Sequence, residues 1–516
     1  MKSYIPTIGL EIHAELKTRT KMFCNSKNDT DEKRPNVNIC PVCMGHPGTL
    51  PTINKEAVKQ VLKVGLACGG ELADFTEFDR KNYFYPDIPK GYQISQYKFP
   101  LVKEGSLAGI SLTRIHLEED TGTLIHADNT APRQSASLVN FNRAGVPLME
   151  LVTLPVIHSA EEASRFAKEL QLLLQYLGVA EANMEKGEMR VEANISVSPK
   201  VESRKLKVDQ KKDDSGSHSP LSTFHSQNLG TKVEVKNLNS FRAVEKAIKY
   251  EVARHIELLE AGEKVVQETR GWDENKEETF SQRQKEDSHD YRYFPDPDLP
   301  KLYIREIREF KKEILQKELP ELPWQRRDRY KKEFGLKDAE AEIYVSMPEW
   351  GIFLEAVAKE LSSSKEEVKL ASNYISSDLI GLVKRGKTTE VKPPNPEPGG
   401  LTSARTLPLP SDFAALIRMI ADAKVSSRAA KDILKIMHEE GGKPATIAAR
   451  QNLLQKSDEE ELKKIVERIL ADNQTVVSDY KAGKKTALQF LIGKAMKATK
   501  GSANPEILKK LLTSLL

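Results

Sequence analysis

The sequence predicts an α+β protein in which a sheet-containing region over residues 1–300 is followed by helical regions up to the C-terminus. Three observations predict this architecture. Apolar and polar residues alternate with period two in several segments before residue 300, apolar stripes with helical spacing dominate after it, and proline-rich segments separate the two patterns. Because each strand pattern carries one polar face, we expect a mixed or antiparallel sheet.

Length and composition indicate a folded chain of several domains. At roughly 150 residues per domain, 516 residues leave room for two to four domains. Apolar residues make up 39% of the chain, a share that fits neither a disordered nor a fibrous protein. No apolar run reaches the length of a membrane helix and no signal-like segment follows Met1, so we expect a cytoplasmic protein.

Three segments of the first region predict strands with one charged face. Over residues 8–16, apolar residues alternate with polar ones that include Glu11 and His13. Residues 190–198 and 232–236 repeat the pattern. Charged faces are common on solvated sheets, but three of them in one region indicate the floor of a binding site.

Capping signals predict the helices between these strands. Ser159 and Glu162 form a capping box, and Gly178 ends the apolar stripe that follows. A second helix is predicted from about Ser240 to Gly262.

Breaks in these patterns predict the domain organisation. Prolines near residue 300 end the strand region, and a segment containing PPNPEPGG interrupts the helical one. We expect a domain at 1–300 with a mobile insertion at 202–219, a helical domain at 301–386, a Pro-rich linker at 387–410, and an all-helical domain at 411–516.

The C-terminal residues are strongly basic. From Lys481 to Leu516 there are eight lysines and one acid, Glu506, although the net charge of the whole chain is only +4. A basic end on a near-neutral body predicts contact with a polyanion, and a solvated lysine face is the alternative interpretation.

Acid-rich segments carry the first chemical signal. Glu11 and His13 share one strand, the segment 114–120 has the sequence RIHLEED, and Glu150 follows in PLME. Carboxylates with an occasional imidazole suit a hard divalent cation such as Mg²⁺, whereas structural salt bridges are the alternative. Phosphate-binding glycine loops and nucleophile elbows are absent from the sequence.

The cysteines carry a second signal. Cys40 and Cys43 have metal-ligand spacing, Cys24 offers a third sulfur and His46 a fourth ligand. A structural zinc site is one interpretation, and reduced, buried thiols are the other. Four cysteines in a chain of this length are too few for a disulfide framework, which favours a reducing compartment.

A family resemblance joins these signals. In order over residues 9–300, the segments GLEIH, FDRKNYFYPDIPKGYQISQ, TRIHLEED, NRAGVPLMELV, KNLNSF, QETRGWDE and DYRYFPDPDLP resemble the GatB family of glutamyl/aspartyl-tRNA amidotransferase components. The ending FLIGKAMKATKGSANPEILKKLL resembles the YqeY-like helical tail of the same family.

The resemblance implies a function. Such enzymes use ATP and Mg²⁺ to phosphorylate the side-chain carboxylate of Glu-tRNA(Gln) or Asp-tRNA(Asn), and ammonia then displaces phosphate to give the amide. Glutamine hydrolysis would take place in an amidase partner (GatA), with a small third protein (GatC) completing a heterotrimer. A noncatalytic tRNA-binding or assembly protein with the same fold and a zinc-dependent RNA-binding protein are the alternatives.

The resemblance also implies roles for individual residues. His13, Glu119 and Glu150 are the expected Mg²⁺ ligands, with Glu11 and Glu118 as further catalytic acids. Alternation along the strand instead places Glu118 on the polar face and Glu119 on the apolar one, so the choice between them stays open. Candidates for binding ATP phosphates or the tRNA end are Arg80, Lys81, Arg190 and Lys236, and candidates for tRNA contact in the tail are Lys494, Lys497 and Lys500. Relatives that bind zinc have a four-cysteine pattern, and in this chain Ser26 replaces one of those cysteines. Zinc binding would therefore need His46 as the fourth ligand.

Overall fold

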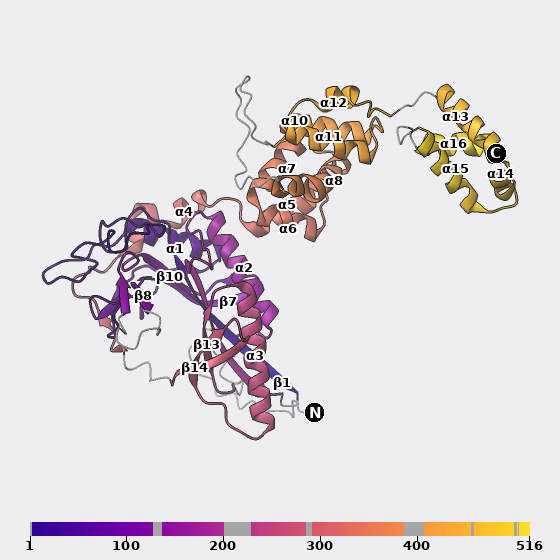
Figure 1. The fold of residues 1–516 in the computed structure, drawn as a ribbon. Helices are drawn as coiled ribbons and strands as arrows, with labels where there is room; N and C mark the ends of the chain where they lie inside the picture. The colour runs from indigo at the N-terminus through magenta and orange to yellow at the C-terminus, as the bar shows by residue number, and fades with distance from the viewer. Residues whose placement is uncertain are drawn as a thin grey trace, which may run out of the picture. The chain divides into compact units, whose positions relative to one another are not determined.

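The computed structural model describes residues 3–126, 137–200, 229–284, 291–385, 407–455, 459–499, 503 and 505–516 (Figure 1). The chain divides into two compact units, Met1–Pro323 and Trp324–Leu516. The sheets lie in the first unit, and the regular elements described in the second are all helical, which confirms the predicted α+β class. The expected insertion at 202–219 lies outside the described residues, as does most of the expected linker, and the four-part domain division stays a prediction.

A ten-stranded sheet is the centre of the first unit. Its order is β14-β13-β12-β11-β1-β10-β7-β5-β2, with β6 paired to β7. Neighbouring strands are antiparallel except β12 and β13, which are parallel. The strands are β1 (Tyr4–Glu15), β2 (Glu71–Leu72), β5 (Val102–Lys103), β6 (Ser106–Leu107), β7 (Ile110–Glu119), β10 (Pro147–Thr153), β11 (Met189–Pro199), β12 (Val233–Leu238), β13 (Glu268–Asp273) and β14 (Glu278–Gln284).

Strand β1 runs through the middle of this sheet and confirms the predicted alternation. Ile8, Leu10 and Ile12 are buried, whereas Glu11 and His13 lie on the opposite face. In the antiparallel register His13 pairs with Glu150 of β10 on one side and with Arg190 of β11 on the other. The polar faces of neighbouring strands therefore meet beside β1.

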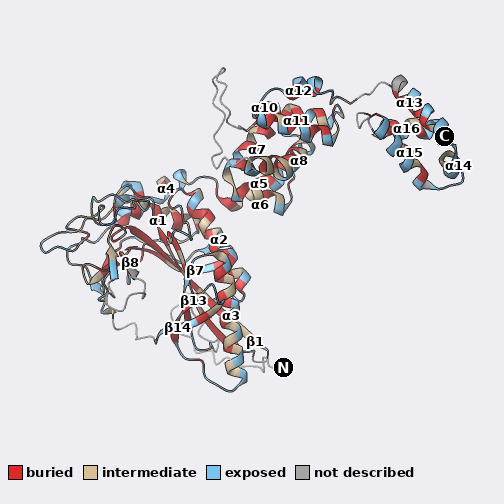
Figure 2. Ribbon diagram, in the orientation of Figure 1, coloured by how far each residue is buried: buried red, intermediate tan, exposed pale blue. Residues whose placement is uncertain are grey.

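Two long helices cover the apolar face of the sheet (Figures 1 and 2). They are α2 (Ala160–Tyr176) and α3 (Phe241–Glu260), which pack against each other and against β1 and β11. The predicted caps are confirmed: the Ser159 hydroxyl accepts a hydrogen bond from the Glu162 backbone N–H at 3.1 Å, and the Ser240 hydroxyl accepts one from the Ala243 N–H at 3.0 Å. Both helices therefore lie on the face of the sheet opposite Glu11 and His13.

Two small sheets complete the first unit. Strands β15 (Phe294–Pro295), β3 (Asp79–Asn82) and β4 (Tyr92–Ser95) form one, and β8 (Thr123–His126) and β9 (Ser137–Asn140) form the other. The remaining helical elements of the unit are α1 (Lys55–Ala67), the 3₁₀ turns η3 (Ile304–Glu306) and η4 (Arg308–Phe310), and α4 (Lys312–Glu318).

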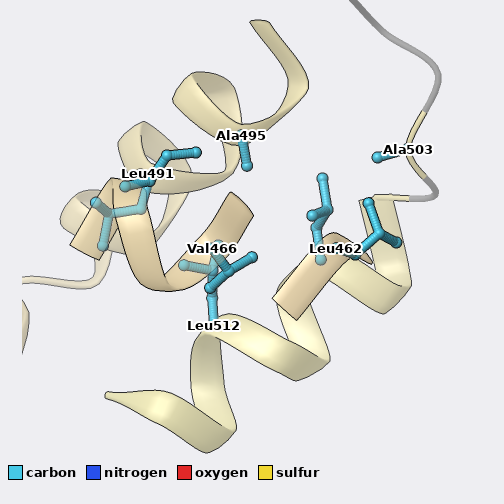
Figure 3. Close-up of a cluster of buried hydrophobic side chains, with 8 residues drawn as sticks. Leu462, Val466, Leu491, Ala495, Ala503 and Leu512 are labelled. Carbon is cyan, nitrogen blue, oxygen red and sulfur yellow. The ribbon is translucent and has the colours of Figure 1, made fainter. Parts of the chain in front are cut away.

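The second unit consists of amphipathic helices. They are α5 (Pro323–Phe334), whose first residue belongs to the first unit, α6 (Asp338–Ser346), α7 (Pro348–Glu360), α8 (Lys365–Tyr374), a π-helical turn η5 (Ile375–Leu379), α9 (Ile380–Arg385), α10 (Pro410–Ala421), α11 (Ser427–Glu439), α12 (Pro444–Arg450), α13 (Glu459–Asp472), α14 (Gln474–Lys481), α15 (Lys485–Ala498) and α16 (Pro505–Leu515). Helices α13, α15 and α16 share an apolar cluster that includes Leu462, Val466, Leu491 and Leu512 (Figure 3). Among the described helices of the whole chain, none has the length and apolar character needed to cross a membrane.

Candidate active site

Three adjacent strands bring carboxylates and histidines together on the polar face of the large sheet. His13 Nε2 on β1 lies 3.4 Å from Glu150 Oε2 on β10, 3.6 Å from Glu118 Oε1 on β7 and 3.9 Å from Glu11 Oε1. His116 Nε2 on β7 lies 3.4 Å from the same Glu150 oxygen. One ligand atom each from Glu11, His13 and Glu150 lies within 4.8 Å of the other two, and the same holds for His116, Glu118 and Glu150. We call these five residues the acid–histidine cluster.

Glu119 does not join this cluster. Strand β7 continues regularly through Glu119, so its side chain points to the face opposite Glu118. There its two carboxylate oxygens lie 2.6 and 2.7 Å from Lys90 Nζ, and Oε1 accepts the backbone N–H of Ile94 at 2.9 Å. The structure therefore brings Glu118, and not Glu119, next to His13, in agreement with the period-two alternation, and the choice of metal ligand between them stays a prediction.

Burial is the largest influence on the pKa values of the cluster, and the neighbouring charges come second. Burial, together with Glu150 and Glu192, raises the pKa of Glu11 to about 7. Burial also raises the pKa of Glu118. Burial alone would lower the pKa of His13. The hydrogen bond from His13 to Glu150 and the charges of Glu150 and Glu118 outweigh burial and raise that pKa to about 9. A cation bound between these carboxylates would favour their charged forms.

Arg114 and His116 lie in this site although sequence reasoning assigned them no role. Arg114 Nη2 is 3.4 Å from Glu150 Oε1, and its buried Nε makes no hydrogen bond among the described residues. Buried His116 Nδ1 likewise lacks a partner there, and burial lowers the pKa of His116 to about 4. The signal that could have found both residues is the same alternation that selects Glu118.

Three of the four cations predicted to bind phosphates or the tRNA end are paired with carboxylates. Each pair is close: Arg80 Nε donates to Asp296 Oδ2 and Arg190 Nη2 to Asp120 Oδ2, both at 2.8 Å, while Lys236 Nζ donates to Glu192 Oε1 at 3.2 Å. Lys81 differs from them, since within the described part of the chain it makes no ion pair. Its ammonium lies 5.1 Å from the centre of the Tyr291 ring. Burial would lower its pKa, but the charges of Glu118 and Glu150 and the neighbouring tyrosines Tyr293 and Tyr83 together outweigh burial and raise that pKa.

The predicted zinc ligands are only partly brought together. The sulfurs of Cys24, Cys40 and Cys43 lie within 4.8 Å of one another, but His46 is not in that group. The nearest polar atoms to the Cys43 sulfur from other residue types are Lys21 Nζ at 3.8 Å and Ser26 Oγ at 3.9 Å. Three sulfurs with an oxygen at the fourth corner are an incomplete set for structural zinc, and zinc binding stays a prediction.

Two of the predicted tail lysines lie on the exposed face of α15. Lys494 and Lys497 are exposed, whereas Leu491 and Ala495 of the same helix are buried in the apolar cluster. Lys500 lies outside the described residues.

Comparisons with known proteins agree over the whole chain. The family model "GatB/GatE catalytic domain" matches residues 6–308, and the model "GatB domain" matches residues 353–516. The chain is 40% identical to the B subunit of the aspartyl/glutamyl-tRNA(Asn/Gln) amidotransferase of Carboxydothermus hydrogenoformans, an alignment that covers 99% of the chain and 98% of the relative. The proteins of the same name from Persephonella marina and Thermotoga neapolitana are also 40% identical, with 99% of both chains covered.

Proposed function

The chain belongs to the GatB family of tRNA-dependent amidotransferase components, and from this premise we propose that the acid–histidine cluster is where ATP activates the carboxylate of a misacylated tRNA. One observation carries the proposal: two buried acids, Glu118 and Glu150, and the partly exposed Glu11 converge on His13. A protein that only binds tRNA has no need for such a costly arrangement. The comparisons do not favour the noncatalytic alternative.

The residues of the cluster fit a magnesium ion. We expect His13, Glu118 and Glu150 to hold it, with Glu11 close by. Carboxylate oxygens are the preferred ligands of Mg²⁺, and one ligand atom each from Glu11, His13 and Glu150 lies within 4.8 Å of the other two. When bound, the ion would neutralise phosphate oxygens and the charge that develops on the transferred phosphoryl group.

Lys81 is the proposed phosphate-binding cation. It projects from β3 beside the cluster and has no ion pair among the described residues, whereas Arg80, Arg190 and Lys236 are paired with carboxylates. An ammonium without a carboxylate partner is available to form a charge-assisted hydrogen bond with a phosphate and to stabilise the charge that develops there. Arg114 is the second candidate for this role: its Nη2 is 3.4 Å from Glu150, but its Nε lacks a partner among the described residues.

The proposed chemistry has two steps. A side-chain carboxylate oxygen of the aminoacyl group attacks the γ-phosphorus of ATP, which forms an acyl phosphate and releases ADP. Ammonia then attacks the acyl carbon, phosphate leaves with the bonding electrons, and the nitrogen loses a proton. Phosphorylation is needed because a carboxylate is a poor electrophile. We expect ammonia from an amidase partner, GatA, with the small protein GatC in the same complex.

We propose that the basic helices at the C-terminus bind tRNA. Lys494 and Lys497 present exposed ammonium groups on one helix, as contact with a phosphate backbone requires. Such contacts carry little base information, so this part would recognise the shape of the tRNA.

The decisive test is ATP hydrolysis by the complex reconstituted with GatA and GatC, with and without glutamyl-tRNA or aspartyl-tRNA. We expect stimulation by at least one aminoacyl-tRNA that disappears in Glu150→Ala, since Glu150 contacts both histidines. No stimulation by either aminoacyl-tRNA, together with normal tRNA binding, would refute the proposed activity.

A further inference from the structure

Four tyrosines form an aromatic cluster, and Lys81 lies beside two of them. The rings of Tyr97 and Tyr293 are stacked, with centroids 4.4 Å apart and an angle of 13° between their planes. Tyr291 makes edge contacts with Tyr293 at 6.1 Å and with Tyr83 at 5.9 Å. The Lys81 ammonium lies 5.1 and 5.9 Å from the Tyr291 and Tyr83 centroids. We call these four tyrosines the tyrosine platform.

The platform is held by the small sheet β15-β3-β4. Asn82 Nδ2 donates to the Tyr291 and Arg292 carbonyls at 3.3 and 2.9 Å, which fixes the segment before β15 against β3. The backbone N–H of Tyr97 donates to Asp79 Oδ2 at 2.9 Å. The Arg80 pair with buried Asp296 joins β3 to the chain after β15, so Arg80 has a structural role in this sheet.

The same small sheet also contacts the acid–histidine cluster. Ser95, the last residue of β4, donates its hydroxyl to Glu118 Oε2 at 3.2 Å, and it pairs with Asp79 of β3. Lys81 is two residues along β3 from Asp79. The platform and the proposed phosphate site are therefore neighbouring parts of one rigid element.

Exposure distinguishes the platform from ordinary core aromatics. Tyr97 remains 59% exposed although Tyr293 covers one face of its ring. Buried aromatic pairs normally bring both rings into the core. A stacked pair with one largely exposed ring, in the same aromatic cluster as tyrosines that contact an ammonium without an ion pair among the described residues, has the features with which proteins bind a base and its phosphates.

We propose that the tyrosine platform binds an adenine ring by stacking on Tyr97. This inference rests on the proposed function and adds a subsite to it. Adenine reaches this site from two sources, ATP and the 3′-terminal adenosine of the tRNA. Stacking needs only a π face, so the platform would contribute affinity for the base, and Lys81 would meet the attached phosphate groups.

The test uses the reconstituted complex with Tyr97→Leu, which removes the ring, and Tyr97→Phe, which keeps it. Phe84→Leu is the matched control, because Phe84 is 87% exposed and belongs to none of the stacked or edge contacts of the platform. We expect Tyr97→Leu to raise one KM by roughly tenfold or more, while Tyr97→Phe and Phe84→Leu stay within about twofold of wild type. Thermal melting and complex assembly verify that each variant is folded.

Ligands that lack the base identify the source. If the platform binds the adenine of ATP, the KM for ATP rises and the difference between wild type and Tyr97→Leu disappears with ribose 5-triphosphate. If it binds the terminal adenosine, the KM for glutamyl-tRNA rises, and the difference disappears with tRNA whose 3′-terminal base is missing. Either outcome supports the proposal.

Unchanged KM values in Tyr97→Leu, in a complex whose ATP hydrolysis still depends on Glu118, would overturn the platform alone. Loss of any dependence of ATP hydrolysis on Glu118 would instead overturn the proposed function, and the adenine subsite with it.

Discussion

Separate substitutions of the two adjacent glutamates of β7, Glu118 and Glu119, test the site most directly. Glu118→Gln removes a charge 3.6 Å from His13 Nε2 but keeps the shape of the side chain and a hydrogen-bonding oxygen for Ser95. At an effective dielectric constant of about 20, two unit charges at that separation interact with about 4.6 kcal/mol. Loss of one electrostatic group in active sites costs roughly 10²- to 10³-fold in turnover. We expect a decrease of that size, together with a higher Mg²⁺ requirement.

Glu119→Gln is the matched control. It keeps an oxygen for the Ile94 backbone N–H but leaves the Lys90 ammonium, whose side chain is 11% exposed, without its counter-charge. Removing one partner of a buried pair costs about 3–5 kcal/mol, so we expect a lower melting temperature and an unchanged Mg²⁺ requirement. The assay is ATP hydrolysis stimulated by glutamyl-tRNA, measured against Mg²⁺ concentration. A raised Mg²⁺ requirement in Glu119→Gln, with Glu118→Gln resembling wild type, would refute the assignment.

Three further predictions follow from other parts of the molecule. We expect Lys81→Met to lower ATP hydrolysis by more than about tenfold without lowering the melting temperature. Arg80→Met should lower the melting temperature, because buried Asp296 loses its partner. Equal melting temperatures of the two variants would contradict the different roles of Arg80 and Lys81. Burial would raise the pKa of Glu251, but His255 and Arg254 beside the carboxylate lower it to about 2. Glu251 therefore stabilises the native state fully above about pH 4.5 and loses this contribution as the pH falls toward 2. The free energy of unfolding in urea should therefore be about 3 kcal/mol higher for wild type than for Glu251→Gln at pH 7, and the difference should be smaller at pH 3. The same difference at both pH values would contradict the pKa argument. Lys497→Ala should weaken tRNA binding and reduce the slope of log K against log salt by about one, and an unchanged slope in a filter-binding titration would exclude a phosphate contact.

Local rules account for much of what could be predicted before any coordinates. The capping signals at Ser159 and Ser240 set where two helices begin, because a cap needs only the first turn of its own helix. Period-two alternation identified β1, β11 and β12, since each residue of a strand points to the face opposite its neighbour. Alternation also separated Glu118 from Glu119, where family resemblance taken alone would have chosen the other residue.

Pairing between distant segments was beyond sequence reasoning. Arg80 and Lys81 are adjacent cations, but Asp296, which is 216 positions away, neutralises only Arg80. His46 follows Cys43 closely in sequence, yet it lies outside the group of three sulfurs. In each case the role depends on which side chains another segment brings within a few ångströms, and no spacing along one strand or loop encodes that.

The sequence by itself determined the α+β class, the polar face of β1, the helix caps and the family of this chain, because these depend on neighbouring residues and on motif order. The tertiary structure alone decided that the acids of β1, β7 and β10 meet at His13, that Lys81 stays unpaired among the described residues, and that it lies beside two tyrosines of an aromatic cluster of four. The physical reason is range: alternation and capping act over a few residues, whereas a binding site consists of groups from strands that only the register of the sheet places side by side.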